Sequence, residues 1–210
     1  MDGSVQNKER KWNTRRHAKQ LKIDMVSQYA DGVVIPTQDI VQVLEILIKA
    51  GDRVVLEGNN QKQADFLSRS LAQTNSDILH DLHMIMPSVG RPEHLDLFEK
   101  GTARKLDFSF AGTQSLRISQ LVEDGLLEIG AIHTYIELYS RLLVDLIPNV
   151  VLSAGFMADR EGNIYTGAST EDTPALIEPA AFSDGIVIVQ FNELVDDVKD
   201  LPRVDIPASW

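Results

Sequence analysis

A short polar loop, Gly58-Asn59-Asn60-Gln61-Lys62, is the segment of this chain whose residue types point most directly to chemistry. Glycine allows a backbone to approach a ligand closely, and the amides of Asn59, Asn60 and Gln61 donate and accept hydrogen bonds without adding negative charge. Such a loop suits a carbonyl, a thioester or a carboxylate better than a bare pyrophosphate. We predict that Gly58, Asn59, Asn60 and Gln61 bind substrate. The alternative is a plain turn whose amides cap the next helix.

The position of this loop supports the first interpretation. An apolar strand is expected over residues 53–57, and an amphipathic helix over residues 63–73. In a parallel α/β sheet, ligands bind just beyond the carboxyl ends of the strands, and the free N–H groups at a helix start favour anions. The loop is neither a phosphate-binding P-loop nor a dinucleotide-binding G-x-G-x-x-G motif.

Two other loops are candidates for substrate contact. Residues 165–173 form a small-residue segment rich in hydroxyl groups, ahead of a helix expected from Pro174. Its hydroxyls can contact a substrate, but Thr173 is equally well placed to cap that helix. Gly112-Thr113 follows the strand expected at residues 106–110, and it also has a capping interpretation.

The acidic and histidine residues give weaker signals. Glu57 and Glu171 are possible nucleophiles or bases, although a surface carboxylate is the commoner fate of such residues. No G-x-S-x-G elbow is present, so nothing marks a serine nucleophile. His80 and His83 lie three residues apart in an expected strand, which directs them to opposite faces. We therefore expect no metal site.

Strands alternating with helices predict an α/β fold with a mostly parallel sheet flanked by helices. Near-continuous apolar runs at residues 150–152 and 186–189 indicate central strands that are buried on both faces. Pro87 is expected to end its strand. The expected strands are 53–57, 82–86, 106–110, 126–132, 150–158 and 185–191. The expected helices are 13–29, 37–51, 63–73, 92–101, 114–123, 135–146 and 174–182.

Composition excludes several classes of protein. The 210 residues are 43% hydrophobic and 24% charged and include no cysteine, which rules out disulfides, a zinc–thiolate site and a cysteine nucleophile. The net charge is −11. Because residues 1–23 sum to +5, the rest of the chain is strongly acidic. An acidic body argues against nucleic acid as the main partner. We expect a flexible basic tail over residues 1–11 and one domain over residues 12–210. No run is long enough to cross a membrane, and we expect a cytoplasmic location.

Six contiguous blocks of the sequence stand out, at residues 12–16, 56–67, 81–84, 128–135, 163–167 and 170–174. Together these blocks resemble the α subunit of bacterial malonate decarboxylase. The resemblance covers essentially everything from Trp12 to Trp210, and further blocks at residues 158–163 and 204–207 resemble the wider coenzyme A transferase superfamily. Long contiguous blocks are more specific than any single motif.

The resemblance implies an acyl-carrier-protein transferase. Such a subunit exchanges acetate for malonate on a carrier thioester, so that acetyl-S-ACP and malonate give malonyl-S-ACP and acetate. The prosthetic arm of the carrier derives from dephospho-coenzyme A, and decarboxylase subunits then act on the malonyl carrier. The implied partners are the acyl carrier protein and the decarboxylase subunits, without nucleic acid or membrane. The α subunit itself needs no metal or biotin, and no bound cofactor is expected.

The family chain is much longer than this one and resembles two tandem α/β halves, with the active site between them. In related coenzyme A transferases the nucleophilic glutamate lies in the second half. The resemblance therefore implies a nucleophile beyond residue 210, and no catalytic residue is assigned here. The chain runs irregularly from Asn192 to Trp210, so we expect that it is cut inside a longer protein.

Two alternatives remain at this point. The chain can be a non-catalytic module that binds a small carboxylate or a phosphorylated metabolite on the same fold, or a purely structural subunit of the decarboxylase assembly. Exchange of malonate onto a carrier thioester supports the transferase. Ligand binding without exchange supports the module, and association with the other subunits alone supports the structural role.

Overall fold

A sheet of six parallel strands forms the centre of the molecule in a computed structural model that describes residues 11–58, 62–168, 170, 172–198 and 206–209. The strand order is β4-β3-β2-β1-β5-β8, and every neighbouring pair is parallel. The chain builds outward from β1 to β4 and then returns to the other side of β1. The strands are β1 (Arg53–Leu56), β2 (Leu82–Ser88), β3 (Ala103–Phe110), β4 (Glu128–Ile132), β5 (Val150–Ala154) and β8 (Ile186–Gln190).

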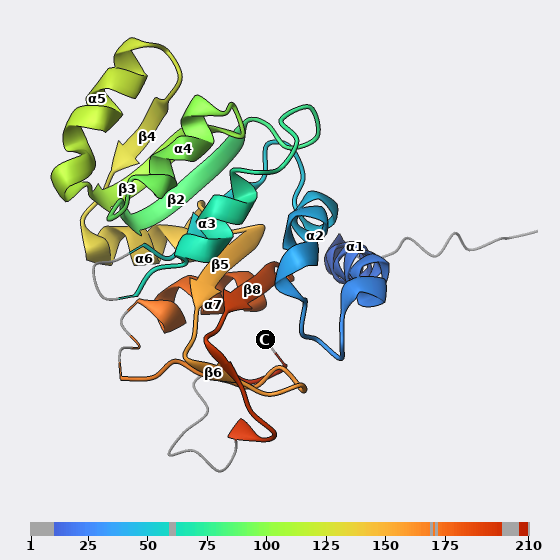
Figure 1. Cartoon of the computed structure of the whole chain (residues 1–210). Helices are drawn as coiled ribbons and strands as arrows, with labels where there is room; N and C mark the ends of the chain where they lie inside the picture. Colours follow the sequence, from blue (N-terminus) through green and yellow to red (C-terminus); the bar gives the residue numbers. More distant parts are fainter. Residues whose placement is uncertain (1–10, 59–61, 169, 171, 199–205, 210) are drawn as a thin grey trace, which may run out of the picture.

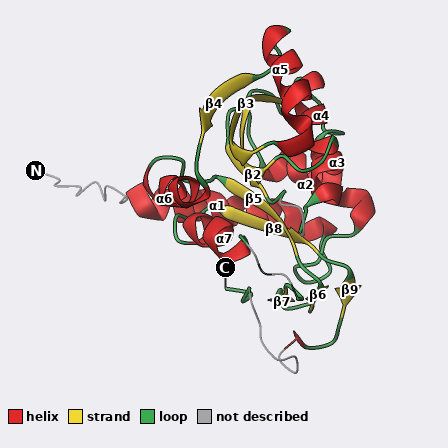
Figure 2. Ribbon diagram, turned by 90° about the vertical axis from the view of Figure 1, so that its left-hand side faces the viewer, coloured by secondary structure: helices red, strands yellow, loops and turns green. Residues whose placement is uncertain are grey.

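Helices cover both faces of this sheet (Figures 1 and 2). Helices α3, α4 and α5 lie on one face, and α6 and α7 lie on the other. Helix α1 packs against α2 and lies away from the sheet in Figure 1. The α-helices are α1 (Lys11–Val26), α2 (Ile40–Leu47), α3 (Asp65–Leu71), α4 (Glu93–Glu99), α5 (Ser115–Glu123), α6 (Tyr135–Val144) and α7 (Thr173–Ala181). Short 3-10 helices are η1 (Ser27–Tyr29), η2 (Thr37–Asp39) and η3 (Gly112–Gln114).

A second, small sheet lies beside the carboxyl ends of β5 and β8. It has the order β7-β6-β9, with β6 (Met157–Ala158) antiparallel to β7 (Ile164–Tyr165) and parallel to β9 (Glu193–Leu194). Gly162 makes the turn between β6 and β7 at a φ of 94°, a conformation that favours glycine. Ile206 adds an isolated bridge to Ile164, which ties the end of the described chain to this sheet.

The alternating side chains of the central strands divide the core into two layers. In β1, Val54 and Leu56 pack toward α2–α5, whereas Val55 packs toward α6 and α7. All five residues of β5 are buried, as expected for a strand with helices on both faces. Burying apolar side chains on both faces removes the sheet from water, which is the main free-energy gain of such a fold.

The predicted α/β fold with a parallel sheet is confirmed, and several predicted boundaries are wrong. Pro87 does not end its strand, because the ladder between β1 and β2 stops at Val55–Ile85 and the missing N–H of Pro87 interrupts no pairing there. The strand expected over residues 150–158 breaks at Gly155 into β5 and β6. The helix expected over residues 37–51 begins as a 3-10 turn and ends at Leu47.

The apolar run at residues 186–189 was expected to be a central strand, but β8 is the last strand of the sheet in the described part of the chain. Most of its residues are only partly buried. An apolar run therefore correctly indicated a strand but not its place in the order. Residues 1–10 of the expected basic tail lie outside the described residues.

Among the helices that the structure describes, none combines the length and the apolar composition needed to cross a bilayer.

Two neighbouring leucines of α6 provide a test of this packing. Leu142 is 0% exposed between α6 and the sheet, whereas Leu143 is 61% exposed. We expect Leu142→Ala to lower the free energy of unfolding by about 2–5 kcal/mol, because it leaves a cavity in the core. Leu143→Ala is the matched control and should change it by less than about 0.5 kcal/mol. Denaturant unfolding measures both values, and equal losses would contradict the two-layer core.

Candidate functional site: a buried carboxylate at the strand switch

The strand order reverses direction between β1 and β5. Strands β2, β3 and β4 continue on one side of β1, while β5 and β8 lie on the other. At such a switch point the connections leave in opposite directions and open a crevice beyond the carboxyl ends of the strands. The crevice here has a volume of about 250 Å³. Its lining residues are Lys62, Gln63, Asp65, Ala154, Gly155, Phe156, Thr166, Gln190 and Asn192.

Glu57 lies directly after β1, behind the part of the crevice wall formed by Lys62 and Ala154, and its side chain is 0% exposed. Its Oε2 atom accepts hydrogen bonds from Ser153 Oγ at 2.5 Å and from the backbone N–H of Ala154 at 3.2 Å. Its Oε1 atom accepts one from Thr173 Oγ1 at 2.6 Å. One carboxylate therefore joins β1, the end of β5 and the start of α7.

Lys62 completes this network from the crevice wall. Its Nζ atom donates to Thr173 Oγ1 and lies 3.8 Å from Glu57 Oε1. The threonine hydroxyl thus accepts from the ammonium and donates to the carboxylate. A buried charge is tolerated when it is paired and hydrogen-bonded, and both conditions are met here.

Burial raises the pKa of Glu57 above its ordinary value, although the Lys62 ammonium and the hydrogen bonds that it accepts act in the opposite direction. Both carboxylate oxygens are engaged and the side chain has no exposed surface. A nucleophile or base must reach the substrate, and in this arrangement the Glu57 carboxylate is turned to its buried donors instead. The geometry makes this residue an acceptor that holds its donors in place.

Gly58 follows Glu57 and packs tightly against two neighbours. A Cβ atom at this position would lie 2.5 Å from the carbonyl oxygen of Ser88 and 2.6 Å from Cε1 of His94. We expected glycine to allow close approach of a ligand, and the close approach that the structure shows is to β2 and α4. The base of the loop is closed by a bridge between Gly58 and Gln63.

His94 is the buried imidazole beneath this loop. It is 0% exposed, and neither of its buried ring nitrogens has a hydrogen-bond partner among the residues that the structure describes. Burial lowers the pKa of His94 from 6.5 to about 4, so the ring is neutral at pH 7. Unpaired buried nitrogens carry a free-energy cost.

The predicted site residues have different outcomes. Asn59, Asn60 and Gln61 lie outside the described residues, as does Glu171, so their roles stay predictions. In the segment 165–173, Thr166 lines the crevice. The capping interpretation of Thr173 is wrong, because Asp172 is the N-cap residue and the Thr173 hydroxyl bonds to Glu57 instead.

The other candidate residues lie away from the crevice. Gly112-Thr113 form part of η3, beyond β3 and two strands away from β1. His80 and His83 do not come together. His80 contacts Asp81 at 2.8 Å, whereas His83 Nε2 lies 2.5 Å from Asp107 Oδ2.

The carboxylate of Asp107 also contacts His133 Nε2 at 2.6 Å, so two imidazoles share one carboxylate. These two hydrogen bonds lower the pKa of Asp107, even though its burial acts to raise it. A Cβ atom on Gly130 would lie 2.1 Å from Asp107 Oδ2, so a side chain there would disturb the cluster. The cluster joins β2, β3 and the end of β4. In the part of the chain that the structure describes, no three acidic or histidine residues group as metal ligands.

Sequence reasoning missed Ser153 and Gln190. Each is a polar residue at or near the carboxyl end of an apolar strand, in Val-Val-Leu-Ser and Ile-Val-Ile-Val-Gln. Gln190 donates to Asp65 Oδ1 at 3.1 Å and accepts from the backbone N–H of Leu67 at 3.1 Å. A polar residue that ends a buried strand was the available signal, since such residues face the crevice in a parallel sheet.

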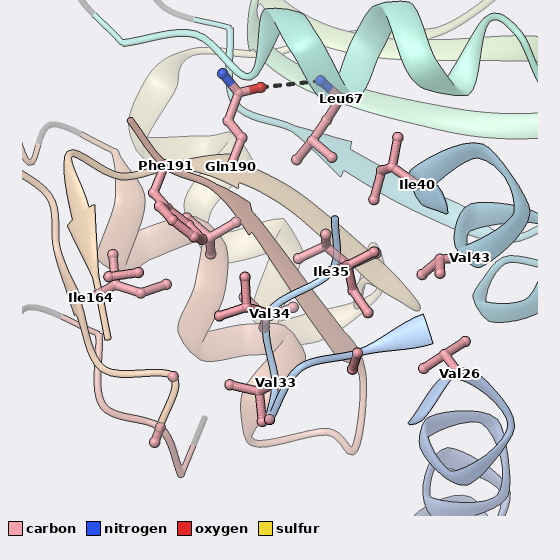
Figure 3. A pocket seen from close by; sticks show the side chains of 18 of the residues that line it. Val26, Val33, Val34, Ile35, Ile40, Val43, Leu67, Ile164, Gln190 and Phe191 are labelled. Atoms are coloured by element: carbon pink, nitrogen blue, oxygen red, sulfur yellow. Dashed lines mark hydrogen bonds between the residues drawn. The ribbon is translucent and has the colours of Figure 1, made fainter. Parts of the chain in front are cut away.

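A larger groove of about 810 Å³ lies next to the crevice and shares Asp65, Gln190 and Asn192 with it. Figure 3 shows its mostly aliphatic lining, with Val34 and Ile35 on the segment before η2 and Phe191 beyond β8. An aliphatic groove suits an apolar segment. The smaller crevice gathers the polar and charged groups, so we take the crevice as the candidate site despite its size.

His94 makes stability depend on pH. Its pKa of about 4 lies below the ordinary 6.5, so the unfolded chain binds the proton first as the pH falls. The contribution of His94 to the free energy of unfolding is therefore present above pH 6.5 and is lost as the pH falls toward 4. We expect the unfolding free energy to drop by about 2 kcal/mol more between pH 7 and pH 5 in the parent protein than in His94→Gln. Denaturant titrations at both pH values test this. An equal drop in unfolding free energy in the parent protein and in His94→Gln would contradict it.

The sequence matches the family described as "Malonate decarboxylase, alpha subunit, transporter" over residues 11–210. The acetyl-S-ACP:malonate ACP transferase of Malonomonas rubra is 49% identical over 182 residues, which cover 87% of this chain and 32% of that protein. A crystal structure of a malonate decarboxylase α subunit from Acinetobacter baumannii is 87% identical, with a TM-score of 0.92, covering 96% of this chain and 37% of that one.

A Pseudomonas malonate decarboxylase hetero-tetramer in complex with malonate contains a chain that is 75% identical, with a TM-score of 0.92, covering 95% of this chain and 36% of that one. Glutaconate coenzyme A-transferase from Acidaminococcus fermentans shares the fold at 13% identity, with a TM-score of 0.63, covering 80% of this chain and 71% of that one. The chain thus spans about a third of the length of its high-identity relatives. It belongs to the malonate decarboxylase α subunit family, on a coenzyme A transferase-like fold.

Proposed function

We propose that this chain provides the acyl-binding part of an acyl-carrier-protein transferase, which exchanges acetate for malonate on a carrier thioester. The observation that carries the proposal is the 49% identity to an acetyl-S-ACP:malonate ACP transferase across most of the chain. The polar crevice at the strand switch supports it, because acyl exchange needs fixed hydrogen-bond donors near a thioester. The sequence identity favours this function over a non-catalytic module.

Acyl exchange places negative charge on the carbonyl oxygen of the thioester as the acyl bond is attacked. Preorganised N–H donors in a site shielded from water stabilise such charge more than water does, because they need no reorganisation. Gly58 and the Asn59, Asn60 and Gln61 amides are proposed as these donors. Gly58 is fixed against Ser88 and His94, which anchors the start of the loop beside the crevice.

The catalytic nucleophile is proposed to lie outside these 210 residues. Glu57 is the buried acidic residue behind the crevice wall, and its carboxylate is enclosed by hydrogen-bond donors. Its contribution is to fix the buried Thr173 hydroxyl and to hold Lys62 on the crevice wall. We assign no bound metal or cofactor to this chain.

The partners are proposed by the same reasoning. The carrier presents its thioester on an arm derived from dephospho-coenzyme A, and holding that arm in place converts a bimolecular step into a local one. The Pseudomonas relative occurs in a hetero-tetramer with malonate. We therefore propose the acyl carrier protein and the decarboxylase subunits as partners, and malonate and acetate as the exchanging acids.

An exchange assay tests this function. Acetylated carrier protein is incubated with malonate and either this chain or a counterpart of full family length, and intact-mass spectrometry then detects the malonyl carrier. Malonyl carrier formed by the full-length protein is the expected result. If the full-length protein forms none but binds malonate in calorimetry, the binding-module alternative replaces the transferase.

The amide loop is tested in the full-length protein. We expect Asn59→Ala or Asn60→Ala to lower kcat for exchange by about 10²–10³-fold, the usual loss for one oxyanion donor. Gln28→Ala is the control, since Gln28 lies in η1, outside the crevice lining. Steady-state kinetics and circular dichroism separate a catalytic loss from misfolding. Full activity in both loop variants with an unchanged fold would remove the loop from the mechanism.

A further inference from the structure

Lys62 occupies an unusual position for a lysine. Its side chain is 7% exposed, and it lies on the wall of the crevice rather than on the outer surface. Lysines are almost never buried unless they are paired. The pairing is provided by Thr173, whose hydroxyl accepts a hydrogen bond from the ammonium, and by Glu57, whose Oε1 atom lies 3.8 Å from Nζ.

Glu57 is the counter-charge of Lys62, and the two carboxylates at and behind the crevice also accept hydrogen bonds from groups other than Lys62. Glu57 accepts hydrogen bonds on both oxygens, from Ser153, Ala154 and Thr173. Asp65, the acidic residue of the crevice lining, accepts from Arg69 at 2.9 Å and from Gln190 at 3.1 Å. Among the described residues that line the crevice, Lys62 is the one cation.

Once they are bound to the carrier as acyl groups, the two exchanging acids differ by one charge. Acetate uses its single carboxylate to form the thioester, so the acetyl group is neutral. Malonate keeps a second carboxylate after its first has become the acyl group. A partly desolvated ammonium interacts strongly with such an anion, because the surrounding dielectric is low. A cation beside the acyl group therefore distinguishes malonyl from acetyl.

We propose that Lys62 is the specificity-determining residue that binds the free carboxylate of the malonyl group. The inference rests on the proposed acyl exchange and adds which group recognises the dicarboxylate. The buried Glu57–Thr173 pair holds the ammonium at the crevice wall and thereby reduces the side-chain freedom that a flexible lysine loses on binding.

The test measures how fast the full-length protein exchanges each of two acids onto acetylated carrier protein. Malonate and monomethyl malonate form similar acyl groups, but the second carboxylate of monomethyl malonate is a neutral ester. Lys62→Met should lower kcat/KM for malonate by about 10- to 100-fold, the value of a hydrogen bond to a charged group. The value for monomethyl malonate should change by less than about 3-fold, and Lys62→Arg should restore part of the malonate rate.

Lys62→Met leaves Glu57 without its cation, so a second variant guards against misfolding. The double variant Lys62→Met with Glu57→Gln removes both charges and should show the same loss of malonate preference. Lys105→Met is the matched control, because Lys105 pairs with Glu128 on the outer strands of the sheet and should leave both rates unchanged.

Each outcome bears on one proposal. If the parent protein exchanges neither acid, the transferase function fails. If the parent protein exchanges malonate but Lys62→Met keeps its preference for malonate over monomethyl malonate, the assignment of Lys62 is overturned. An equal loss of both rates in Lys62→Met and in the double variant also overturns it, since the lysine would then only maintain the crevice.

Discussion

The arrangement of the site depends on one buried carboxylate. Glu57 connects three segments that are distant in the sequence, since its donors come from Ser153 and Ala154 at the end of β5 and from Thr173 at the start of α7. Truncating one member of such a network leaves the other buried groups unpaired, which costs more than the bond itself contributes. The raised pKa of Glu57 indicates that burial outweighs its stabilising contacts. Burying the carboxylate costs free energy, and in return it fixes the geometry of the three segments.

The parallel sheet explains why this carboxylate lies where it does. Polar residues that follow apolar strands are brought to the same edge, and the reversal between β1 and β5 opens the space above them. Glu57, Ser153 and Gln190 all come from this edge. Site and fold are therefore linked through strand order, and a different order would have separated the same residues.

The sequence allowed the alternation of strands and helices to be predicted, because apolar periodicity follows from local burial. It also located the loop at Gly58, since a polar turn after an apolar strand is a local pattern. Strand order is a property of long-range pairing, so the edge position of β8 was not predictable from its apolar residues. The role of Thr173 was missed for the same reason, because its partner Glu57 is 116 residues away. His94 gave no signal at all, since a histidine near the start of a helix is ordinary until its burial is known.

The outer edge of β8 has a consequence for handling the isolated chain. β8 is the last strand of the sheet in the described residues, its side chains are aliphatic except for Gln190, and the large groove beside it is lined mainly by aliphatic residues as well. An unpaired apolar edge offers free backbone N–H and C=O groups and an apolar surface to any other extended segment. The net negative charge of the chain opposes such self-association through repulsion between copies. Colloidal behaviour should therefore depend on ionic strength, because added salt screens the repulsion while leaving the apolar edge available.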